Sequence, residues 1–383
     1  MTTKDHRKHG KTVKANFGNF GRMEIAIIGT PCGEIKRLAQ ELIEGLRGFK
    51  VAYVDADHKT EAEDVPDHIQ SGANFIYTDK IKFNRIDFEG PFNKYKKNRF
   101  FNEFDLVLVN GNHFEANMQI IIVDDRKPLE KKLDKIQNPI AILRQREETR
   151  LPEYLENHLG KDLEIQPMYN LDEIDKLADL IKDTLILNIP RLNGLVLTGG
   201  KSERMGKDKG LIDYHGMPQR EYLFQLLENF TESTFMSCRP DQVGDFDKHF
   251  NTLPDSISGL GPFGAIISAF REYPNHAWLV IACDIPLIDQ KTIIQLIQGR
   301  NPSKVATTFF NEETKFPDPL MTIWEPKAYP ELLHFLSLGY SCPRKVLINT
   351  AAEVLNPQNP EDLINANSLG DLERVMKIIQ QRT

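Results

Sequence analysis

The sequence predicts an α/β protein with two domains. The chain has 383 residues, and chains longer than about 250–300 residues usually divide into separate cores. Short apolar runs alternate with amphipathic stretches in both halves, which is typical of parallel sheets covered by helices. Ile189-Pro190 interrupts the alternation, because a helix rarely continues through proline. We therefore expect two three-layer α/β domains, at 23–187 and 188–383, after a flexible basic arm over 1–22.

The composition is that of a globular protein, with 40% hydrophobic and 27% charged residues. A net charge of −7 argues against a general nucleic-acid binder. No apolar run reaches the roughly 18 residues of a membrane span, and the first residues lack the apolar segment of a signal peptide. The 4 cysteines have no metal-ligand spacing and are typical of reduced thiols. We expect a cytoplasmic protein that binds neither nucleic acid nor membrane.

The first half begins with a strand at 24–28 and a turn into a helix around 35–46. Further apolar runs predict strands at 51–55, 106–111 and 118–123, and helical spacing predicts a helix at 171–185. Asp55-Ala56-Asp57-His58 follows one strand and Asn110-Gly111 ends another. This order resembles the P-loop accessory proteins of molybdenum cofactor biosynthesis (MobB-type).

The loop after the first strand departs from a working Walker motif. Such a motif needs Lys for the β/γ-phosphates and a hydroxyl for Mg²⁺. This chain has Gly29-Thr30-Pro31-Cys32-Gly33-Glu34, without that Lys and hydroxyl and with a carboxylate at the phosphate position. A like charge about 4 Å away costs roughly 1–4 kcal/mol. We expect a degenerate P-loop-like domain that has kept its fold, has lost NTP hydrolysis and could dock a cofactor precursor.

The second half predicts another strand–helix series. Its expected strands are 195–197, 234–238, 277–282, 305–310 and 320–324, and its expected helices are 218–230, 263–272, 291–297 and 369–380. Asp289 and Ser368 precede two of these helices and are typical caps. Apolar residues at 332–336 predict one more helix face.

A glycine-rich basic loop follows the first strand of this half. Gly199-Gly200 allows the backbone to approach a ligand, and successive N–H groups of such a loop form an anion nest. Arg204 and Lys209 add the positive charge that a phosphate chain requires. The loop predicts a phosphate site.

Asp284 ends the apolar run 277–283 and is followed by Ile285-Pro286. In open α/β sheets ligands bind at the carboxyl ends of the strands. A carboxylate there, beside a phosphate loop, is suited to hold Mg²⁺ on a triphosphate. Asp284 is therefore the candidate metal ligand.

Four segments together resemble the molybdenum cofactor guanylyltransferases (MobA-type). They are Leu195–Lys209, Asp255-Ser256 with the glycine turn 259–264, Cys283–Pro286, and Asn365-Ala366-Asn367. The resemblance implies a Rossmann-like nucleotide-diphospho-sugar transferase fold. It implies Mg²⁺ on Asp284 and catalytic roles for Arg204, Lys209 and Asp284. The nucleotide-binding residues that it implies are Leu197, Thr198, Gly199, Gly200, Lys209, Asp255, Gly261, Asn365 and Asn367.

The implied activity is transfer of a guanylyl group from GTP to molybdopterin, with or without molybdenum, releasing pyrophosphate. Proteins of molybdopterin synthesis and molybdoenzyme chaperones are the implied partners. Asp255 suits guanine, because a carboxylate accepts two parallel hydrogen bonds and the guanine edge donates two. The chain departs from the family pattern at Met236 and Cys238, where two Asn are usual, and after Asn367, where Ser368-Leu369-Gly370 replaces Thr-Pro-Glu.

Three other functions remain open on the sequence. Cytidylyl transfer to molybdopterin uses the same fold, although those enzymes tend to carry alanine at the position of Gly199. Sugar-phosphate nucleotidyl transfer shares the glycine loop, but the N-terminal domain argues against it. A non-catalytic cofactor carrier is favoured by the degenerate first loop and opposed by Lys209, Asp255 and Asp284.

Overall fold

The computed structural model describes residues 12–57, 65–198 and 208–382. The chain forms two compact units. The first is Phe17–Asn188, and the second is Ile189–Thr383 with the described part of Met1–Asn16. Both are three-layer α/β structures, as the sequence predicts.

The segment before the first strand is docked rather than flexible. The backbone N–H of Asn16 donates to Asn275 Oδ1 at 2.7 Å, within the second unit. Phe20 is only 2% exposed and packs edge-on against two other phenylalanine rings of the first unit. Over 12–22 the segment that we expect to be an arm is thus docked, and Phe20 is the apolar group that anchors it. Its remaining residues lie outside the described part of the chain.

The first unit has a sheet of six parallel strands in the order β2-β5-β1-β6-β7-β8. The central strands are buried on both faces, which explains their continuous apolar sequences. The strands are β1 (Glu24–Ile28), β2 (Val51–Val54), β5 (Leu106–Asn110), β6 (Met118–Val123), β7 (Pro139–Arg144) and β8 (Met168–Asn170).

Helices cover both faces of this sheet. One face packs against α1 (Cys32–Gly45) and α5 (Ile174–Leu187). The other packs against α4 (Glu153–Leu159) and the 3₁₀ helix η2 (Glu130–Lys135), with η3 (Gly160–Ile165) beside them. An insertion between β2 and β5, which was not predicted, contains α2 (Asp67–Gln70), the hairpin β3 (Phe75–Asp79) and β4 (Asn84–Phe88), and α3 (Lys94–Phe101).

The second unit has a seven-stranded sheet in the order β11-β10-β9-β12-β14-β13-β15. Only β14 is antiparallel to its neighbours among these strands. Their bounds are β9 (Leu192–Leu197), β10 (Thr234–Cys238), β11 (Thr252–Pro254), β12 (Ala277–Ala282), β13 (Ala306–Asn311), β14 (Phe316–Trp324) and β15 (Ala352–Leu355).

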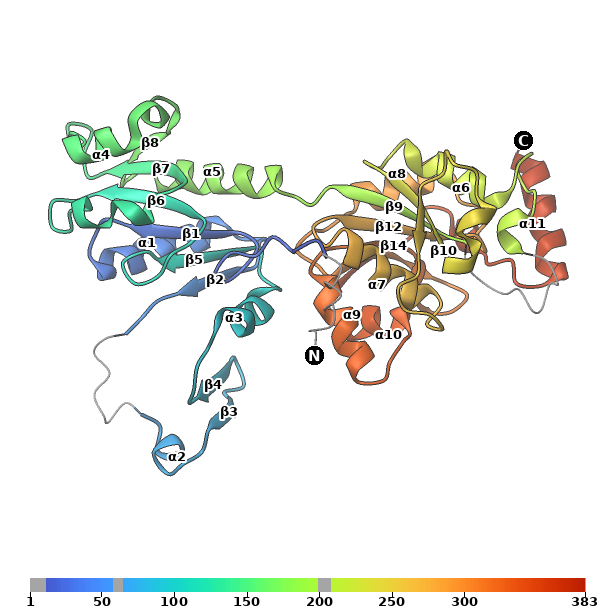
Figure 1. Ribbon diagram of the computed structural model, residues 1–383, viewed down its shortest axis with the longest axis horizontal. Helices are drawn as coiled ribbons and strands as arrows, with labels where there is room; N and C mark the ends of the chain where they lie inside the picture. The colour runs from blue at the N-terminus through green and yellow to red at the C-terminus, as the bar shows by residue number, and fades with distance from the viewer. Residues whose placement is uncertain (1–11, 58–64, 199–207, 383) are drawn as a thin grey trace, which may run out of the picture. The chain divides into compact units, whose positions relative to one another are not determined.

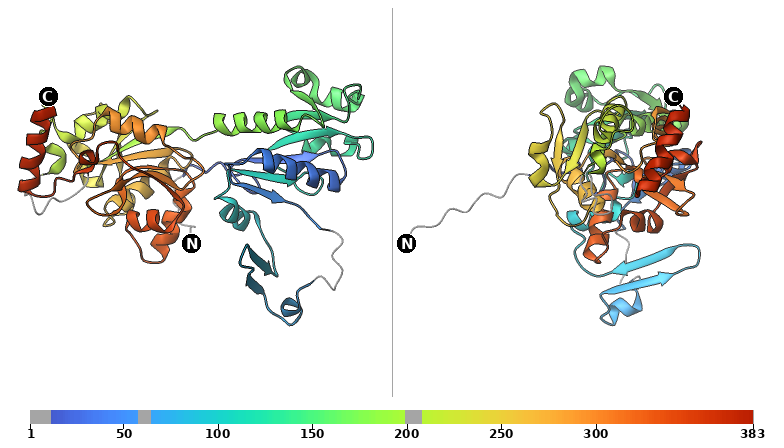
Figure 2. Two further views of the ribbon diagram at one scale, coloured as in Figure 1. Left: turned by 180° about the vertical axis from the view of Figure 1, so that it is seen from behind. Right: turned by 90° about the vertical axis from the view of Figure 1, so that its right-hand side faces the viewer.

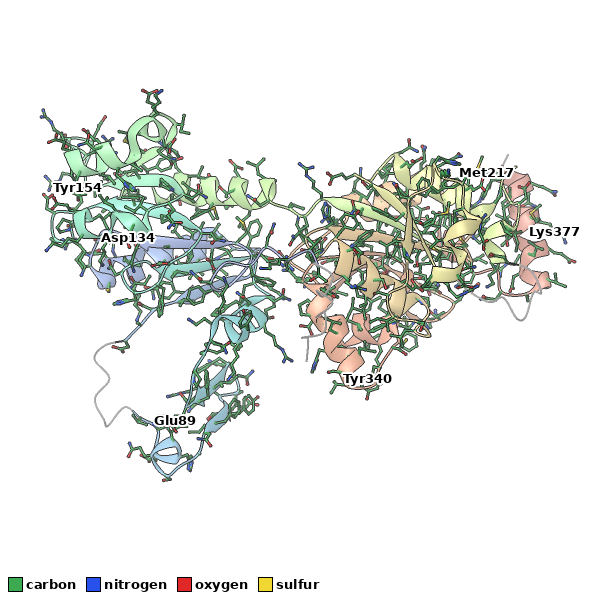
Figure 3. All side chains as sticks on the ribbon, viewed as in Figure 1. Glu89, Asp134, Tyr154, Met217, Tyr340 and Lys377 are labelled. Atoms are coloured by element: carbon green, nitrogen blue, oxygen red, sulfur yellow. The ribbon has the colours of Figure 1, made fainter. Side chains whose placement is uncertain are left out.

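The helices of this unit again lie on both faces of the sheet. One face packs against α6 (Gln219–Glu228) and α8 (Gln290–Gln298), the other against α7 (Pro262–Glu272), α9 (Ala328–Ser337) and α10 (Pro343–Asn349). Helix α11 (Leu369–Arg382) lies at the edge of the unit, red in Figures 1 and 2, and Lys377 in Figure 3 marks its exposed side. Short 3₁₀ turns complete the unit: η4 (Lys209–Leu211), η5 (Pro240–Asp245) and η6 (Pro360–Leu363).

The strand order of the second unit determines where its candidate site lies. From β9 the chain passes to β10 on one side, and later returns to β12 on the other side of β9. Such a reversal leaves a crevice at the carboxyl ends of the central strands. The basic loop leaves β9 at this edge, and Asp284 follows β12 there.

Candidate functional site

The phosphate loop begins where β9 ends. Leu197 is the last residue of β9, and Thr198 is buried behind it. The Thr198 hydroxyl donates to the backbone oxygen of Ser237 at 2.5 Å, which joins the start of the loop to β10. The predicted residues Gly199, Gly200 and Arg204 lie outside the described part of the chain.

Lys209 follows the loop in the sequence and lies at the start of the short turn η4. Asp208 caps the short turn η4, because its carboxylate accepts from the N–H of Gly210 at 2.9 Å. Lys209 Nζ lies 3.9 Å from Asp284 Oδ2 and donates to Asn367 Oδ1 at 2.5 Å. Lys209 thus contacts two other predicted residues that come from distant parts of the sequence.

Asp284 has one oxygen engaged and one free among the described residues. Oδ2 faces Lys209, whereas Oδ1 is buried and has no hydrogen-bond partner there. Burial raises the pKa of this carboxyl, Lys209 opposes the rise, and nearby Asp318 adds to it. An unpartnered buried oxygen is costly unless a ligand satisfies it. The donor fits a hard cation such as Mg²⁺, which prefers oxygen.

The segment Asn365-Ala366-Asn367 is held to the backbone of the same aspartate. The N–H of Ala366 donates to the backbone oxygen of Asp284 at 2.8 Å. Asp371 accepts from the N–H of Asn367 at 3.0 Å, and Ser368 Oγ accepts from the N–H of Asp371 at 3.2 Å, which makes Ser368 the helix cap as predicted. Asn365 Oδ1 is buried without a partner in the described structure. Ala366, between the two asparagines, is therefore fixed next to Asp284.

Asp255 lies farther along the same sheet edge, just after β11. Ser237 Oγ donates to Asp255 Oδ1 at 3.1 Å. Burial raises the pKa of Asp255, and the bond from Ser237 partly opposes this. No contact links Asp255 to Lys209 or Asp284 among the described residues, so it belongs to a separate part of the edge. Gly261 has φ 54 at the start of α7, in the left-handed region that favours glycine.

Two residues beside the site were not predicted as functional. Asp318, on β14, is 2% exposed and accepts hydrogen bonds from Asn311 Nδ2 at 2.9 Å and the N–H of Leu320 at 2.9 Å. Tyr214 is buried, and burial and Asp284 raise its pKa to about 12. The sequence signal for Asp318 is that Phe316-Pro317-Asp318-Pro319-Leu320 resembles the family segment that enters the second-substrate half of the cleft. No sequence signal pointed to Tyr214.

The described residues contain no group of three or more His, Cys, Asp or Glu side chains arranged around a common metal position. In addition, none of the described helices is both long and apolar enough to cross a bilayer.

Residues 194–354 match the MobA-like NTP transferase domain family. The chain is 38% identical over 185 residues to the molybdenum cofactor biosynthesis bifunctional protein of Synechocystis, covering 48% of this chain and 53% of that protein. It is 30% identical over 197 residues to a molybdenum cofactor guanylyltransferase of Pseudomonas aeruginosa, covering 47% of this chain and 97% of that protein.

The chain is also similar to two solved structures of molybdopterin-guanine dinucleotide biosynthesis proteins. Molybdopterin-guanine dinucleotide biosynthesis protein A from Archaeoglobus fulgidus has 20% identity and a TM-score of 0.43, covering 49% of this chain and 99% of that one. Molybdopterin-guanine biosynthesis protein B has 17% identity and a TM-score of 0.31, covering 43% of this chain and 99% of that one. The sequence matches and the signature segments identify the family. On these grounds, the chain belongs to the molybdenum cofactor guanylyltransferase family.

Proposed function

We propose that the domain at 188–383 transfers a guanylyl group from GTP to the terminal phosphate of molybdopterin, releasing pyrophosphate. One observation carries the proposal. Lys209, Asp284 and Asn367 meet at the carboxyl edge of the sheet, where the glycine loop of the family starts. A cation, a metal-suited carboxylate and an amide at one edge are what a nucleoside triphosphate requires.

The reaction needs position and charge rather than an activated nucleophile. The attacking group is a phosphomonoester, whose second pKa is about 6, so it is already anionic at pH 7. No general base is therefore required. Lys209 holds the triphosphate, together with the backbone of Gly199 and Gly200, and Arg204 offsets charge on the departing pyrophosphate.

Asp284 would hold Mg²⁺ through its unpartnered Oδ1. When bound, the ion supplies positive charge that neutralises the phosphate oxygens. Lys209, at 3.9 Å on the other carboxylate oxygen, keeps Asp284 oriented and partly offsets its charge before substrate arrives.

The remaining predicted residues bind the two substrates. Asp255 reads the guanine edge, while Gly261 lets the backbone at the start of α7 approach the base. Leu197 and Thr198 form the floor under the nucleotide. Asn365 and Asn367 line the cleft, and the unpartnered Oδ1 of Asn365 is available to a ligand donor.

Titration calorimetry with GTP, CTP and UTP in Mg²⁺, followed by pyrophosphate release with molybdopterin, tests the proposal. We expect micromolar, Mg²⁺-dependent GTP binding and much weaker CTP binding, both lost in Asp284→Ala. Preference for CTP would assign cytidylyl transfer. Full activity of Asp284→Ala would remove the metal role, and absence of any nucleotide binding would favour a cofactor carrier.

We assign no NTP hydrolysis to the domain at 23–187. The Thr30 hydroxyl donates to Asp124 at 2.6 Å, and Arg126 binds the same carboxylate at 2.8 Å. Arg126 also lies 3.8 Å from Glu34. The groups around the degenerate loop are thus engaged with one another. Turnover of ATP or GTP by a chain whose transferase site is disabled by Asp284→Ala would contradict this assignment.

A further inference from the structure

A cavity of about 250 Å³ lies in the first unit. Its wall comes from four separate segments of the chain: the segment before β1, helix α3, the turn after β5, and the end of η2. The charged and aromatic residues of the wall that matter here are Lys94, Lys97, Lys135, His113, Phe114 and Glu115.

The charge of this wall is unbalanced. Three lysines face one glutamate, and none of the three forms an ion pair with a carboxylate among the described residues. Elsewhere in the unit, Lys176 and Lys182 do pair with carboxylates, at 2.6 and 2.8 Å. Lys132 adds a fourth cation near this wall, since Lys135 is among the groups that lower its pKa, after burial and Lys127. Like charges gathered in this way repel one another unless an anion joins them.

Helix α3 adds to the imbalance. It begins at Lys94 and carries no acid in its first turn. Helix N-termini bear a partial positive charge, so acids are favoured there and lysines are disfavoured. A helix that starts with a lysine and places Lys97 one turn later is electrostatically suited to an anion at this wall.

One of these cations, Lys97, is held in place by aromatic contacts. Lys97 Nζ lies 4.8 Å from the ring centroid of Phe20 and 5.5 Å from that of Phe114. Its stem is half-buried, so the ammonium group has little freedom. His113 Nε2 is hydrogen-bonded to Cys32 Sγ at 3.2 Å, which fixes the imidazole at the rim. A preorganised wall of this kind binds with a smaller entropy cost.

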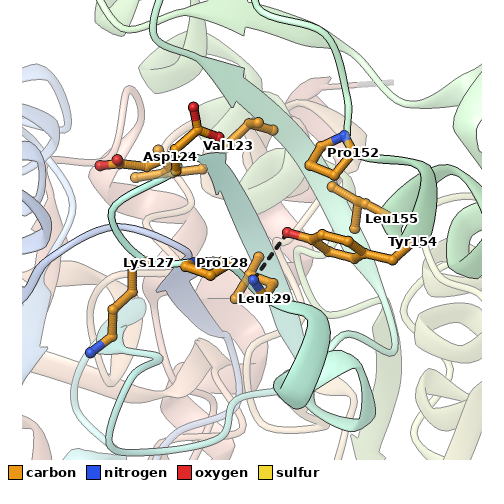
Figure 4. A pocket seen from close by; sticks show the side chains of 10 residues that line it. Val123, Asp124, Lys127, Pro128, Leu129, Pro152, Tyr154 and Leu155 are labelled. Atoms are coloured by element: carbon orange, nitrogen blue, oxygen red, sulfur yellow. Dashed lines mark hydrogen bonds between the residues drawn. The ribbon is translucent and has the colours of Figure 1, made fainter.

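The nearby cavity beside the degenerate loop is different. This smaller cavity has a volume of about 160 Å³. Figure 4 shows the side chains that line it, among them Asp124, Lys127 and Tyr154. The Tyr154 hydroxyl accepts a hydrogen bond from the N–H of Leu129 at 3.1 Å. Two acids and one lysine line it. The neighbouring Arg126 is bound to Asp124. An anion is therefore favoured at the lysine-lined cavity and not at this one.

We propose that the cavity lined by Lys94, Lys97 and Lys135 binds a phosphate dianion, either free phosphate or the phosphate group of an organic phosphomonoester. Its volume is below the roughly 300–1,000 Å³ of pockets that enclose a whole drug-sized ligand. It therefore accepts the phosphate end of a molecule whose remainder stays outside. This site is independent of the transferase site in the second unit.

Calorimetric titration of the full chain at low salt, with inorganic phosphate and with phenyl phosphate, tests the proposal. The test variant is Lys94→Gln/Lys97→Gln. The control is Lys96→Gln/Arg99→Gln, on the same helix, with the same change of charge and outside the cavity wall. Binding at the transferase site is common to both variants and cancels in their comparison.

We expect the test variant to weaken phosphate binding at least tenfold and the control variant less than twofold. Lys94→Gln alone, at an exposed position, should weaken it at least threefold with an unchanged unfolding temperature, which separates binding from folding. Tighter binding of phenyl phosphate indicates an organic ligand, and equal binding indicates free phosphate; both support the site. Equal weakening by the two double variants, or no phosphate binding by the unmodified chain, would overturn it.

Discussion

Asp284→Asn should make the substrate-free protein more stable while removing its activity. Lys209 lies 3.9 Å from Asp284, and at an effective dielectric of about 20 this attraction amounts to roughly 4 kcal/mol. Burying a carboxylate costs several kcal/mol. The raised pKa of Asp284 shows that burial exceeds the attraction. The ionised side chain therefore destabilises the folded state relative to a neutral amide of the same shape.

The pH dependence follows from the sign of this shift. A carboxyl whose pKa is raised on folding binds its proton more tightly in the native state. Its contribution favours folding below the ordinary value of 3.8 and is lost as the pH rises through the native pKa. At pH 7 we expect Asp284→Asn to gain about 0.5–1.5 kcal/mol, or about 1–5 °C in Tm. The gain should shrink in acid.

Activity should change in the opposite direction. Loss of the metal-suited oxygen removes several kcal/mol of transition-state stabilisation, so turnover should fall about 10³-fold. Mg²⁺ and GTP at 100 times Kd should stabilise the unmodified protein by about 2.7 kcal/mol and the variant far less. Denaturant unfolding with and without ligand, together with pyrophosphate release, measures all three effects.

Asp289→Asn is the matched control. Asp289 caps α8 by accepting from the N–H of Thr292 at 3.0 Å, and asparagine caps a helix about as well as aspartate. This variant should keep both stability and turnover. A lower stability of Asp284→Asn at pH 7, or turnover within tenfold of the unmodified enzyme, would refute the reasoning about Asp284.

Three shorter predictions concern other contacts. Asn367→Ala removes the acceptor for Lys209 at 2.5 Å and should slow pyrophosphate release about 10–100-fold without lowering Tm. Arg382→Met breaks the 2.9 Å pair with Asp362 that anchors α11 and should cost about 1–2 kcal/mol in denaturant unfolding. Arg126 hydrogen bonds hold the pKa of Asp124 at about 2, so this carboxylate stabilises the fold above its ordinary pKa of 3.8. Asp124→Asn should therefore cost about 1–2 kcal/mol at pH 7, and unfolding followed from pH 4 to pH 2 should show that difference disappearing.

Sequence patterns located the elements that are buried on both faces. β1, β5 and β12 are continuous apolar runs, and such runs are identifiable without knowing their neighbours. The β3–β4 hairpin was missed because its pattern does not follow burial. Phe75 pairs with Phe88 across this hairpin, yet both rings are at least 40% exposed. Apolar residues that stay exposed give no clear signal of a strand.

The residues of the candidate site differ in how far the sequence alone could predict them. Lys209 and Asp284 could be placed together by chemistry, since both follow strands of a parallel sheet. Asn367 could be found only through resemblance, because its position depends on where α11 docks after the last strand. Asp318 influences Asp284 because β14 runs antiparallel beside β12, and no local pattern specifies that pairing.

The degenerate loop of the first unit explains how a phosphate-binding fold persists without its ligand. Gly29 keeps the tight backbone of such a loop, with φ 101 and the carbonyl of Ile122 so close that a side chain could not fit. In a working P-loop the ligand satisfies the polar groups around this turn. Here the Thr30 hydroxyl is satisfied by Asp124, and Asp124 by Arg126. The polar groups of this turn are therefore satisfied within the protein, which removes the cost of leaving them unpaired.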